Sequence, residues 1–558
     1  MVLKTGFNLI QNSGQKRAKS RLRKFSKRDK RALEAITSSG AFDQGGLTTT
    51  DVLHEHGMFK KGESSLPIGV HDGRILRDNL DSPIAILSRP GGGKGTCLGF
   101  PMMAEWKHSS FTLDVDCEYV RSVSPFRRSL GHKQIFLNAC GLYGFPSDCL
   151  NPFRRLIRLV QEDIHAAIAE ARELAQLIVP DTPAKQQSQN NWIDKGARKL
   201  IEMALIYLAK DRPYQCTLAG LLEFLSQPIP AMLDAIGMNA TIVFAVKRAT
   251  TFVAEYFAEA QKQVQWKVEE ACEALQIIQP GSPYDLATSA SSFDPRSVKT
   301  ADQPIDIYLM VEGRRLETEA NYLSLLMSHI IEEAANAPGD RPFLVLADEF
   351  SQLAKSRVLI KAMRAYRKRK IKIVTMSQGR QSTIDRYGQN LAHDIEDMAG
   401  TKIWIDPPYQ IARELSQKGG YHTATSRNIG DAPDGRYTTS YSESAQPNLP
   451  VSELVSGSGA LAGKMIIEHK GVPGLIVADK VPWWEIYPYA EQLSNDYRDD
   501  FYQYQPPPVR VSRDEALAMF GLSDPFMASD VTARARLLQG SFPQPIINAA
   551  LNALGGSQ

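Results

Sequence analysis

Short apolar runs and longer amphipathic segments alternate in two separate parts of the chain. A short apolar run has the length of a buried strand, whereas apolar positions three or four residues apart indicate a helix. The expected strands are 83–87, 111–116, 134–138, 305–311, 343–347, 371–376 and 402–405, and the expected helices are 94–106, 118–130, 317–335, 356–367 and 391–398. This alternation predicts a parallel sheet covered by helices.

Residues 155–300 have a different pattern, with long helical periods at 163–177, 192–209 and 253–275 and few β-branched runs. We therefore expect an all-helical domain inserted into an α/β domain. The α/β domain then consists of two segments, 41–154 and 301–500, which is consistent with a chain of 558 residues that is too long for one core.

The remaining segments have weaker patterns. Residues 41–80 are rich in Gly, Thr and Asp and are expected to form an irregular lead-in to the first core strand. Residues 421–448 are polar and are expected to form a surface loop, followed by short strands at 465–468 and 475–478. Three prolines at 506–508 mark the start of a tail, 501–558, with short amphipathic helices.

Basic residues are concentrated near the N-terminus, although the whole chain has a net charge of only +3. Ten of them lie between Lys16 and Arg31 with a single acid, Asp29. The arm, residues 1–40, is expected either to be a solvated tail or to bind nucleic acid or an anionic membrane surface. The six cysteines form no C-x-x-C pair, and no apolar stretch is long enough to cross a membrane, which favours a cytoplasmic protein.

A glycine-rich loop follows the first expected strand and precedes a helix. Its sequence from residue 88 to 96 is SRPGGGKGT. Backbone N–H groups of such a loop converge on phosphate at a helix N-terminus, and the lysine reaches the β- and γ-phosphates. The residues expected to bind nucleotide are Arg89, Pro90, Gly91, Gly92, Gly93, Lys94, Gly95 and Thr96. Ser88 replaces the usual first glycine, and Gly95 replaces the usual hydroxyl residue.

Two acids follow the buried run 343–347, and a glutamine follows the next buried run, 371–376. We expect Asp348 to bind a magnesium ion and Glu349 to act on the attacking water, because both follow the strand 343–347. Gln378 is placed to sense the γ-phosphate, or else caps its strand. One arginine of the basic segment 364–370 is a candidate to act on the nucleotide of a neighbouring subunit.

The order of these motifs resembles the coupling proteins of type IV secretion and conjugation. The resemblance covers roughly residues 80–490, and a glycine directly after the loop lysine is itself typical of the family. Besides the loop and the acidic strand, it rests on the segments 113–118 (LDVDCE), 150–153 (LNPF), 192–198 (WIDKGAR), 307–311 (IYLMV), 449–454 (LPVSEL) and 471–477 (GVPGLIV).

The resemblance implies a RecA-like P-loop nucleotide-binding domain with an inserted all-alpha domain, acting as a hexameric ATPase with ATP and magnesium. It implies that Lys94 and Thr96 bind phosphate and magnesium, that Asp348 and Glu349 serve hydrolysis, that Gln378 couples nucleotide state to movement, and that Arg367 acts in trans. The implied cargo is single-stranded DNA with its relaxase, delivered to a type IV secretion channel. The alternative is a receptor for protein effectors that uses ATP for assembly or gating.

The chain also departs from the family. Members usually carry transmembrane helices before the ATPase domain, so membrane contact at the inner face of the cell membrane is expected to be peripheral or through partners. Asp116 and Cys117 stand where many members have Lys-Gly, which removes a positive charge near the site. A small-nucleotide kinase also uses Gly-Lys-Gly-Thr, but such enzymes begin almost at their loop and lack the late Asp-Glu strand.

Overall fold

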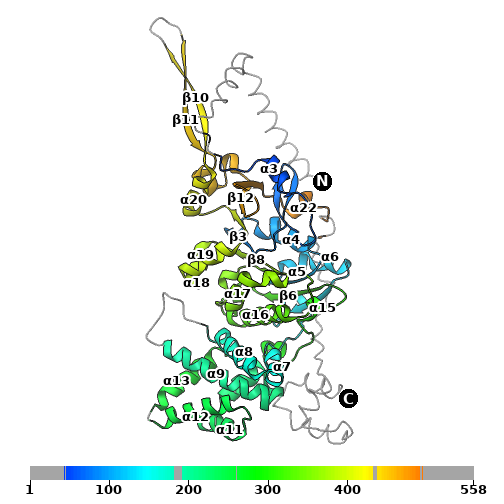
Figure 1. Cartoon of the computed structure of the whole chain (residues 1–558), viewed down its shortest axis with the longest axis vertical. Coiled ribbons are helices and arrows are strands. Elements are labelled where there is room, and N and C mark those ends of the chain that lie inside the picture. The colour runs from blue at the N-terminus through cyan, green and yellow to red at the C-terminus, as the bar shows by residue number, and fades with distance from the viewer. Residues whose placement is uncertain are drawn as a thin grey trace.

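The computed structural model of the chain describes residues 43, 45–180, 191–258, 260–431, 437–489 and 493. The structure is elongated, with helices at one end, a large sheet in the middle and a long hairpin at the other end (Figure 1). The expected basic arm and the expected C-terminal tail lie outside the described residues.

Parallel strands form the centre of an 11-stranded sheet. Their order is β9-β3-β8-β7-β4-β6-β5, and each neighbouring pair is parallel. These strands match the seven predicted ones, and most of their residues are buried, as expected where helices cover both faces. Their bounds are β3 (Ile84–Ser88), β4 (Ser109–Val115), β5 (Lys133–Leu137), β6 (Ile305–Val311), β7 (Phe343–Ala347), β8 (Ile371–Ser377) and β9 (Thr401–Ile405).

Antiparallel strands extend the sheet beyond β9 in the order β12-β13-β1-β2. The two strands predicted at 465–468 and 475–478 are confirmed. The expectation of an irregular lead-in at 41–80 is wrong, because this segment contains a helix and a β-hairpin. Its turn is Asp72–Gly73, both at positive φ, which is a typical hairpin sequence; Pro67 and Gly69 weaken the strand pattern before it. The bounds are α3 (Thr50–Glu55), β1 (Leu66–His71), β2 (Arg74–Asp78), β12 (Lys464–His469) and β13 (Leu475–Asp479).

Helices cover both faces of the sheet. In β7, Phe343 and Val345 belong to one apolar core and Leu344 and Leu346 to the other, because alternate residues of a strand face opposite sides. One core includes residues of α4 and α5, and the other includes residues of α16, α17 and α19. The bounds are α4 (Phe100–Glu105), α5 (Glu118–Ser122), α6 (Ser124–Ser129), α16 (Ala320–Asn336), α17 (Arg357–Ala365), α18 (Arg380–Tyr387), α19 (Gln389–Met398), α20 (Tyr409–Gly419) and α21 (Val451–Ser456).

Between β5 and β6, the described residues form helices joined by turns and irregular stretches, with no strand. The helices predicted at 163–177 and 192–209 are confirmed, whereas the helix predicted at 253–275 is interrupted. Two helices replace it, and both pack on α9, which a single straight helix could contact along only one line. The bounds are α7 (Arg154–Glu162), α8 (Ile164–Ile178), α9 (Asn191–Asp211), α10 (Leu218–Leu225), α11 (Ile229–Asn239), α12 (Val243–Phe257), α13 (Gln261–Glu273), α14 (Pro283–Thr288) and α15 (Ser297–Thr300).

The chain enters and leaves this helical segment at one place. The backbone N–H of Leu150 donates to the carbonyl of Ala287 at 2.8 Å, and that of Ser292 donates to the carbonyl of Cys149 at 2.9 Å. The two connections are therefore hydrogen-bonded to each other beside the neighbouring strands β5 and β6.

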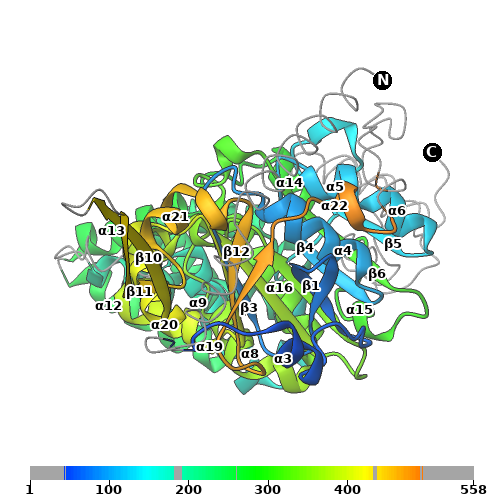
Figure 2. The ribbon, with the colours of Figure 1, turned by 90° about the horizontal axis from the view of Figure 1, so that it is seen from above.

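Two predicted elements have a different form in the structure. The predicted helix 118–130 is divided into α5 and α6, because Pro125 has no N–H to continue the first helix. The predicted loop 421–448 is an antiparallel hairpin of β10 (Tyr421–Asp431) and β11 (Tyr437–Pro447). Seen from above, it lies on the side of the molecule opposite α4, α5 and α6 (Figure 2).

Candidate functional site

The glycine-rich loop connects β3 to the π-helical turn η1 (Gly95–Gly99) at the carboxyl edge of the sheet. Gly91 and Gly93 have φ values of 73° and 92°, which other residues rarely adopt. A Cβ on Gly92 would lie 2.4 Å from the Oγ of Ser88. Ser88 itself ends β3 without positive φ, so the serine is compatible with the turn, as predicted.

Lys94 lies between the two acids that follow β7. Its Nζ atom is 3.0 Å from Oδ1 of Asp348 and also forms an ion pair with Glu349. Glu349, the second residue after β7, has a φ of 52°, in the left-handed region. This conformation lets two consecutive acids contact the same ammonium group, which an extended strand would not allow. The loop and the acidic strand, 254 positions apart in sequence from Lys94 to Asp348, thus form one site.

The acids are buried beneath the loop. Burial raises the pKa of Asp348, and Lys94 opposes this shift. Asp114, at the end of the neighbouring strand β4, is fully buried, and burial raises its pKa to about 8 although it accepts hydrogen bonds from the backbone of Tyr119 and Val120. Burial also raises the pKa of Glu118. Burial thus raises the pKa of three carboxyl groups around Lys94, those of Asp114, Glu118 and Asp348.

Tyr119 is a site residue that the sequence did not reveal. Its hydroxyl lies 3.5 Å from Oδ2 of Asp348, and the ring is buried against η1: a Cβ on Gly99, the last residue of η1, would lie 2.2 Å from the hydroxyl. The one feature of the sequence that could have indicated Tyr119 as a site residue is its position directly after the segment 113–118. Asp116, which stands where many members of the resembled family have lysine, accepts a hydrogen bond from the backbone N–H of Gly313 at 2.8 Å.

The other predicted residues lie around this centre. Thr96 is in the first turn, where its hydroxyl is 3.4 Å from the Gly93 carbonyl. Gln378 is exposed at the carboxyl end of β8, between β3 and β7. Arg89 and Pro90 are exposed, and Arg89 points toward the carbonyl of Val455 at 3.4 Å.

Arg367 does not join the site within one chain. It lies in η7 (Tyr366–Arg369), just before β8, and thus at the amino edge of the sheet. The length of β8 separates it from the loop, which corresponds to roughly 20 Å. An action of Arg367 on nucleotide would therefore require a second copy of the chain.

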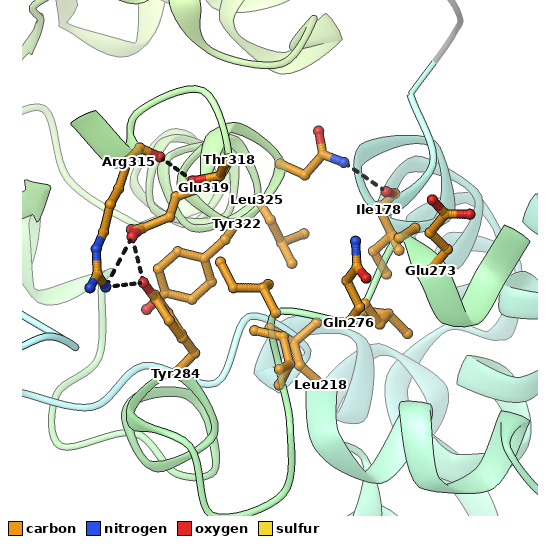
Figure 3. Close-up of a pocket in the computed structure, with 15 residues that line it drawn as sticks. Ile178, Leu218, Glu273, Gln276, Tyr284, Arg315, Thr318, Glu319, Tyr322 and Leu325 are labelled. Carbon is orange, nitrogen blue, oxygen red and sulfur yellow. Dashed lines mark hydrogen bonds and ion pairs between the residues drawn. The ribbon is translucent and has the colours of Figure 1, made fainter. Parts of the chain in front are cut away.

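A cavity of about 560 Å³ lies elsewhere, between the helical segment and the start of α16. Figure 3 shows Tyr284, Arg315 and Glu319 directed toward one another at its wall, while Leu218 and Leu325 form an apolar part of the lining. The hydroxyl of Tyr284 donates to Glu319. None of the glycine-loop residues lines this cavity, so it is separate from the candidate site.

The described residues contain no group of three or more His, Cys, Asp or Glu side chains arranged as a metal site. Thr96 and Asp348 nevertheless fit a magnesium ion that also binds phosphate, because such ions take few protein ligands. The glycine loop and the paired Lys94 likewise fit a nucleoside triphosphate, since phosphate can replace the carboxylates as the partner of the ammonium group.

The raised pKa of Asp114 predicts a pH-dependent stability. Folding raises this pKa from 3.8 to about 8, so the contribution of Asp114 is complete below the unfolded value and is lost as pH rises to the folded value. The stability of the wild type relative to Asp114→Asn should therefore fall between about pH 4 and pH 8, by at most about 1.4 kcal/mol per pH unit. Urea denaturation of both proteins measures this; a difference independent of pH would contradict the assignment.

The chain was compared with known proteins. The family described as "Type IV secretory system Conjugative DNA transfer" matches residues 29–449. No curated protein matches. Among the described residues, no helix has the length and apolar character needed to cross a membrane.

Solved structures of the coupling protein TrwB have the same fold. The unbound form of the bacterial conjugative coupling protein TrwBdeltaN70 is 13% identical, with a TM-score of 0.57 over 78% of this chain and 93% of that one. The plasmid coupling protein TrwB in complex with the ATP analogue ADPNP is 12% identical, with a TM-score of 0.58 over 80% and 96%. TrwB in complex with ADP and Mg²⁺ is 12% identical, with a TM-score of 0.57 over 79% and 94%.

These matches confirm the RecA-like P-loop fold with an all-alpha domain. The family match covers most of the chain, in agreement with the predicted coupling-protein resemblance. The protein therefore belongs to the conjugative DNA-transfer family of type IV secretion systems.

Proposed function

We propose that this protein is a magnesium-dependent ATPase that drives single-stranded DNA, with its attached relaxase, toward a type IV secretion channel. The observation that carries the proposal is Lys94 held by Asp348 and Glu349 beneath a glycine loop. This arrangement occurs in a chain of the conjugative DNA-transfer family. The nucleotide and magnesium seen with TrwB support the same ligands here.

Each residue of the site has a distinct proposed task. Lys94 and the backbone of residues 89–96 bind the phosphates, while Thr96 and Asp348 hold magnesium. Glu349 orients the attacking water and accepts its proton. Gln378 senses the nucleotide state from the end of β8. Bound ATP and magnesium supply the phosphoanhydride bond and the cation that offsets its negative charge.

The buried surroundings support these tasks. Lys94 already contacts both acids, so phosphate binding would exchange one set of anionic partners for another and release Glu349 to act on water. The tyrosine hydroxyl beside Asp348 would restrict the orientation of that carboxylate. We further propose that residues 155–300 form the inserted domain, and that 41–154 and 301–500 form the ATPase domain.

We propose a hexameric ring in which Arg367 of one subunit acts at the site of the next. A ring repeats one head-to-tail contact, which can bring the amino edge of one sheet toward the carboxyl edge of its neighbour. The exposed position of Arg367 at the amino edge supports this role. The proposed location is cytoplasmic, at the inner face of the cell membrane, with membrane contact peripheral or through channel components.

Single-stranded DNA is expected to stimulate ATP hydrolysis severalfold, because a translocating motor couples turnover to its cargo. Steady-state phosphate release with and without DNA measures the effect, and Lys94→Ala serves as the control that assigns the turnover to this site. A rate unaffected by DNA would contradict the motor and would favour a receptor for protein effectors.

A further inference from the structure

An exposed tryptophan lies beside the turn that follows the glycine loop. Trp484 belongs to α22 (Trp483–Ile486), and 49% of the residue is exposed. The helix α22 contacts η1, which begins directly after Lys94. Both views show α22 next to α4, the continuation of η1 (Figures 1 and 2). The ring can thus offer an aromatic surface near a ligand bound in the loop.

A buried neighbour holds this tryptophan in place. Trp483 is only 2% exposed and belongs to the same apolar core as Cys97 and Leu98 of η1. The rings of Trp483 and Trp484 are 5.4 Å apart at an angle of 82°, an edge-to-face contact. Trp483 therefore anchors α22 against η1, and the exposed ring of Trp484 is restricted rather than free.

The segment that leads to α22 passes the β9 side of the loop. Ile405 of β9 is in register with Ser88 of β3, so Asp406 and Arg89 leave neighbouring strands at the same edge. The Nζ atom of Lys480 lies 3.0 Å from Oδ2 of Asp406, which has a φ of 48°. The segment 480–484 thus runs from the start of the glycine loop, where Lys480 contacts Asp406, to η1 at the end of that loop, where α22 packs.

We propose that Trp484 is the platform on which the base of a bound nucleotide stacks, with the Lys480–Asp406 pair at the polar rim. The inference rests on the proposed nucleotide site, because the phosphates must lie in the loop for the base to reach α22. Every base has a π-face, so stacking on an indole discriminates weakly between bases. The ligand class is therefore a nucleoside di- or triphosphate, bound through its phosphates in the loop and through its base on Trp484.

The test separates the base from the phosphates. Magnesium ADP and magnesium pyrophosphate are titrated calorimetrically into the full-length protein, because pyrophosphate retains the diphosphate and lacks the base. Trp484→Ala is expected to weaken ADP binding about 5- to 150-fold and to leave pyrophosphate binding unchanged. Trp484→Phe should restore most of the ADP affinity, since it keeps an aromatic face.

Trp266→Ala is the matched control, because Trp266 is 46% exposed but lies on α13 in the helical segment. It should bind both ligands like the wild type. Unchanged ADP binding by Trp484→Ala would overturn the platform, and so would an equal loss of both ligands, which indicates damage to the loop. Failure of the wild type to bind either ligand would instead overturn the nucleotide site itself.

Discussion

Replacing Glu349 by Gln is expected to lower the ATPase rate by about 100- to 10,000-fold while leaving ATP binding intact. The amide has nearly the same shape as the carboxylate but cannot accept a proton from the attacking water. It also removes one negative partner of Lys94, and Asp348 remains 3.0 Å from that lysine. The phosphate-binding part of the site should therefore persist.

The measurement pairs single-turnover hydrolysis with equilibrium binding of ATP in the presence of magnesium. Glu453→Gln is a suitable control, because this glutamate binds the backbone of Ala460 and Leu461 outside the site. A variant Glu349→Gln that hydrolyses ATP at the wild-type rate would exclude Glu349 as the base. Loss of ATP binding would show instead that the carboxylate maintains the loop.

Replacing Arg367 by Ala is expected to lower the ATPase rate by about 1,000-fold or more, as for other arginines that act across a subunit boundary. In its own chain this arginine lies on the opposite edge of the sheet from Lys94, so the effect must come from a neighbouring subunit. Binding of ATP to a single subunit should remain.

Mixing two inactive variants tests the action in trans. A ring that contains Arg367→Ala and Lys94→Ala subunits has some interfaces with an intact loop on one side and an intact arginine on the other. Mixed rings should therefore regain part of the ATPase activity that each variant lacks alone. Arg364→Ala is the control, because Arg364 is exposed nearby and pairs with Asp394. Absence of recovery in rings shown to be mixed would exclude Arg367 as the trans residue.

The central strands and the glycine loop could be predicted from the sequence because each depends on residues that are contiguous in the chain. The central strands were predicted because each is a buried apolar run. The loop 88–96 was predicted because its glycines and Lys94 are contiguous. The meeting of Lys94 with Asp348 followed from a general rule, since the carboxyl ends of parallel strands share one edge.

Features that depend on distant neighbours were missed. Tyr119 reaches Asp348 only because β4 lies beside β7, and strand order is not encoded in either segment alone. The hairpin of β10 and β11 was predicted as a loop because its sequence lacks the alternation of apolar and polar residues that marks a strand packed on a core. No glycine or proline marks the interruption of 253–275 in the sequence, and both of the resulting helices pack on α9.

The paired connections at Cys149 and Ser292 have a consequence for how this architecture can be altered. Because the chain enters and leaves the helical domain through hydrogen-bonded neighbours, the two ends of that domain are close together whatever its size. A domain attached in this way can be exchanged for another of different length without disturbing β5 and β6. Recombination at this junction would therefore replace the helices as one unit and leave the strand order of the sheet unchanged.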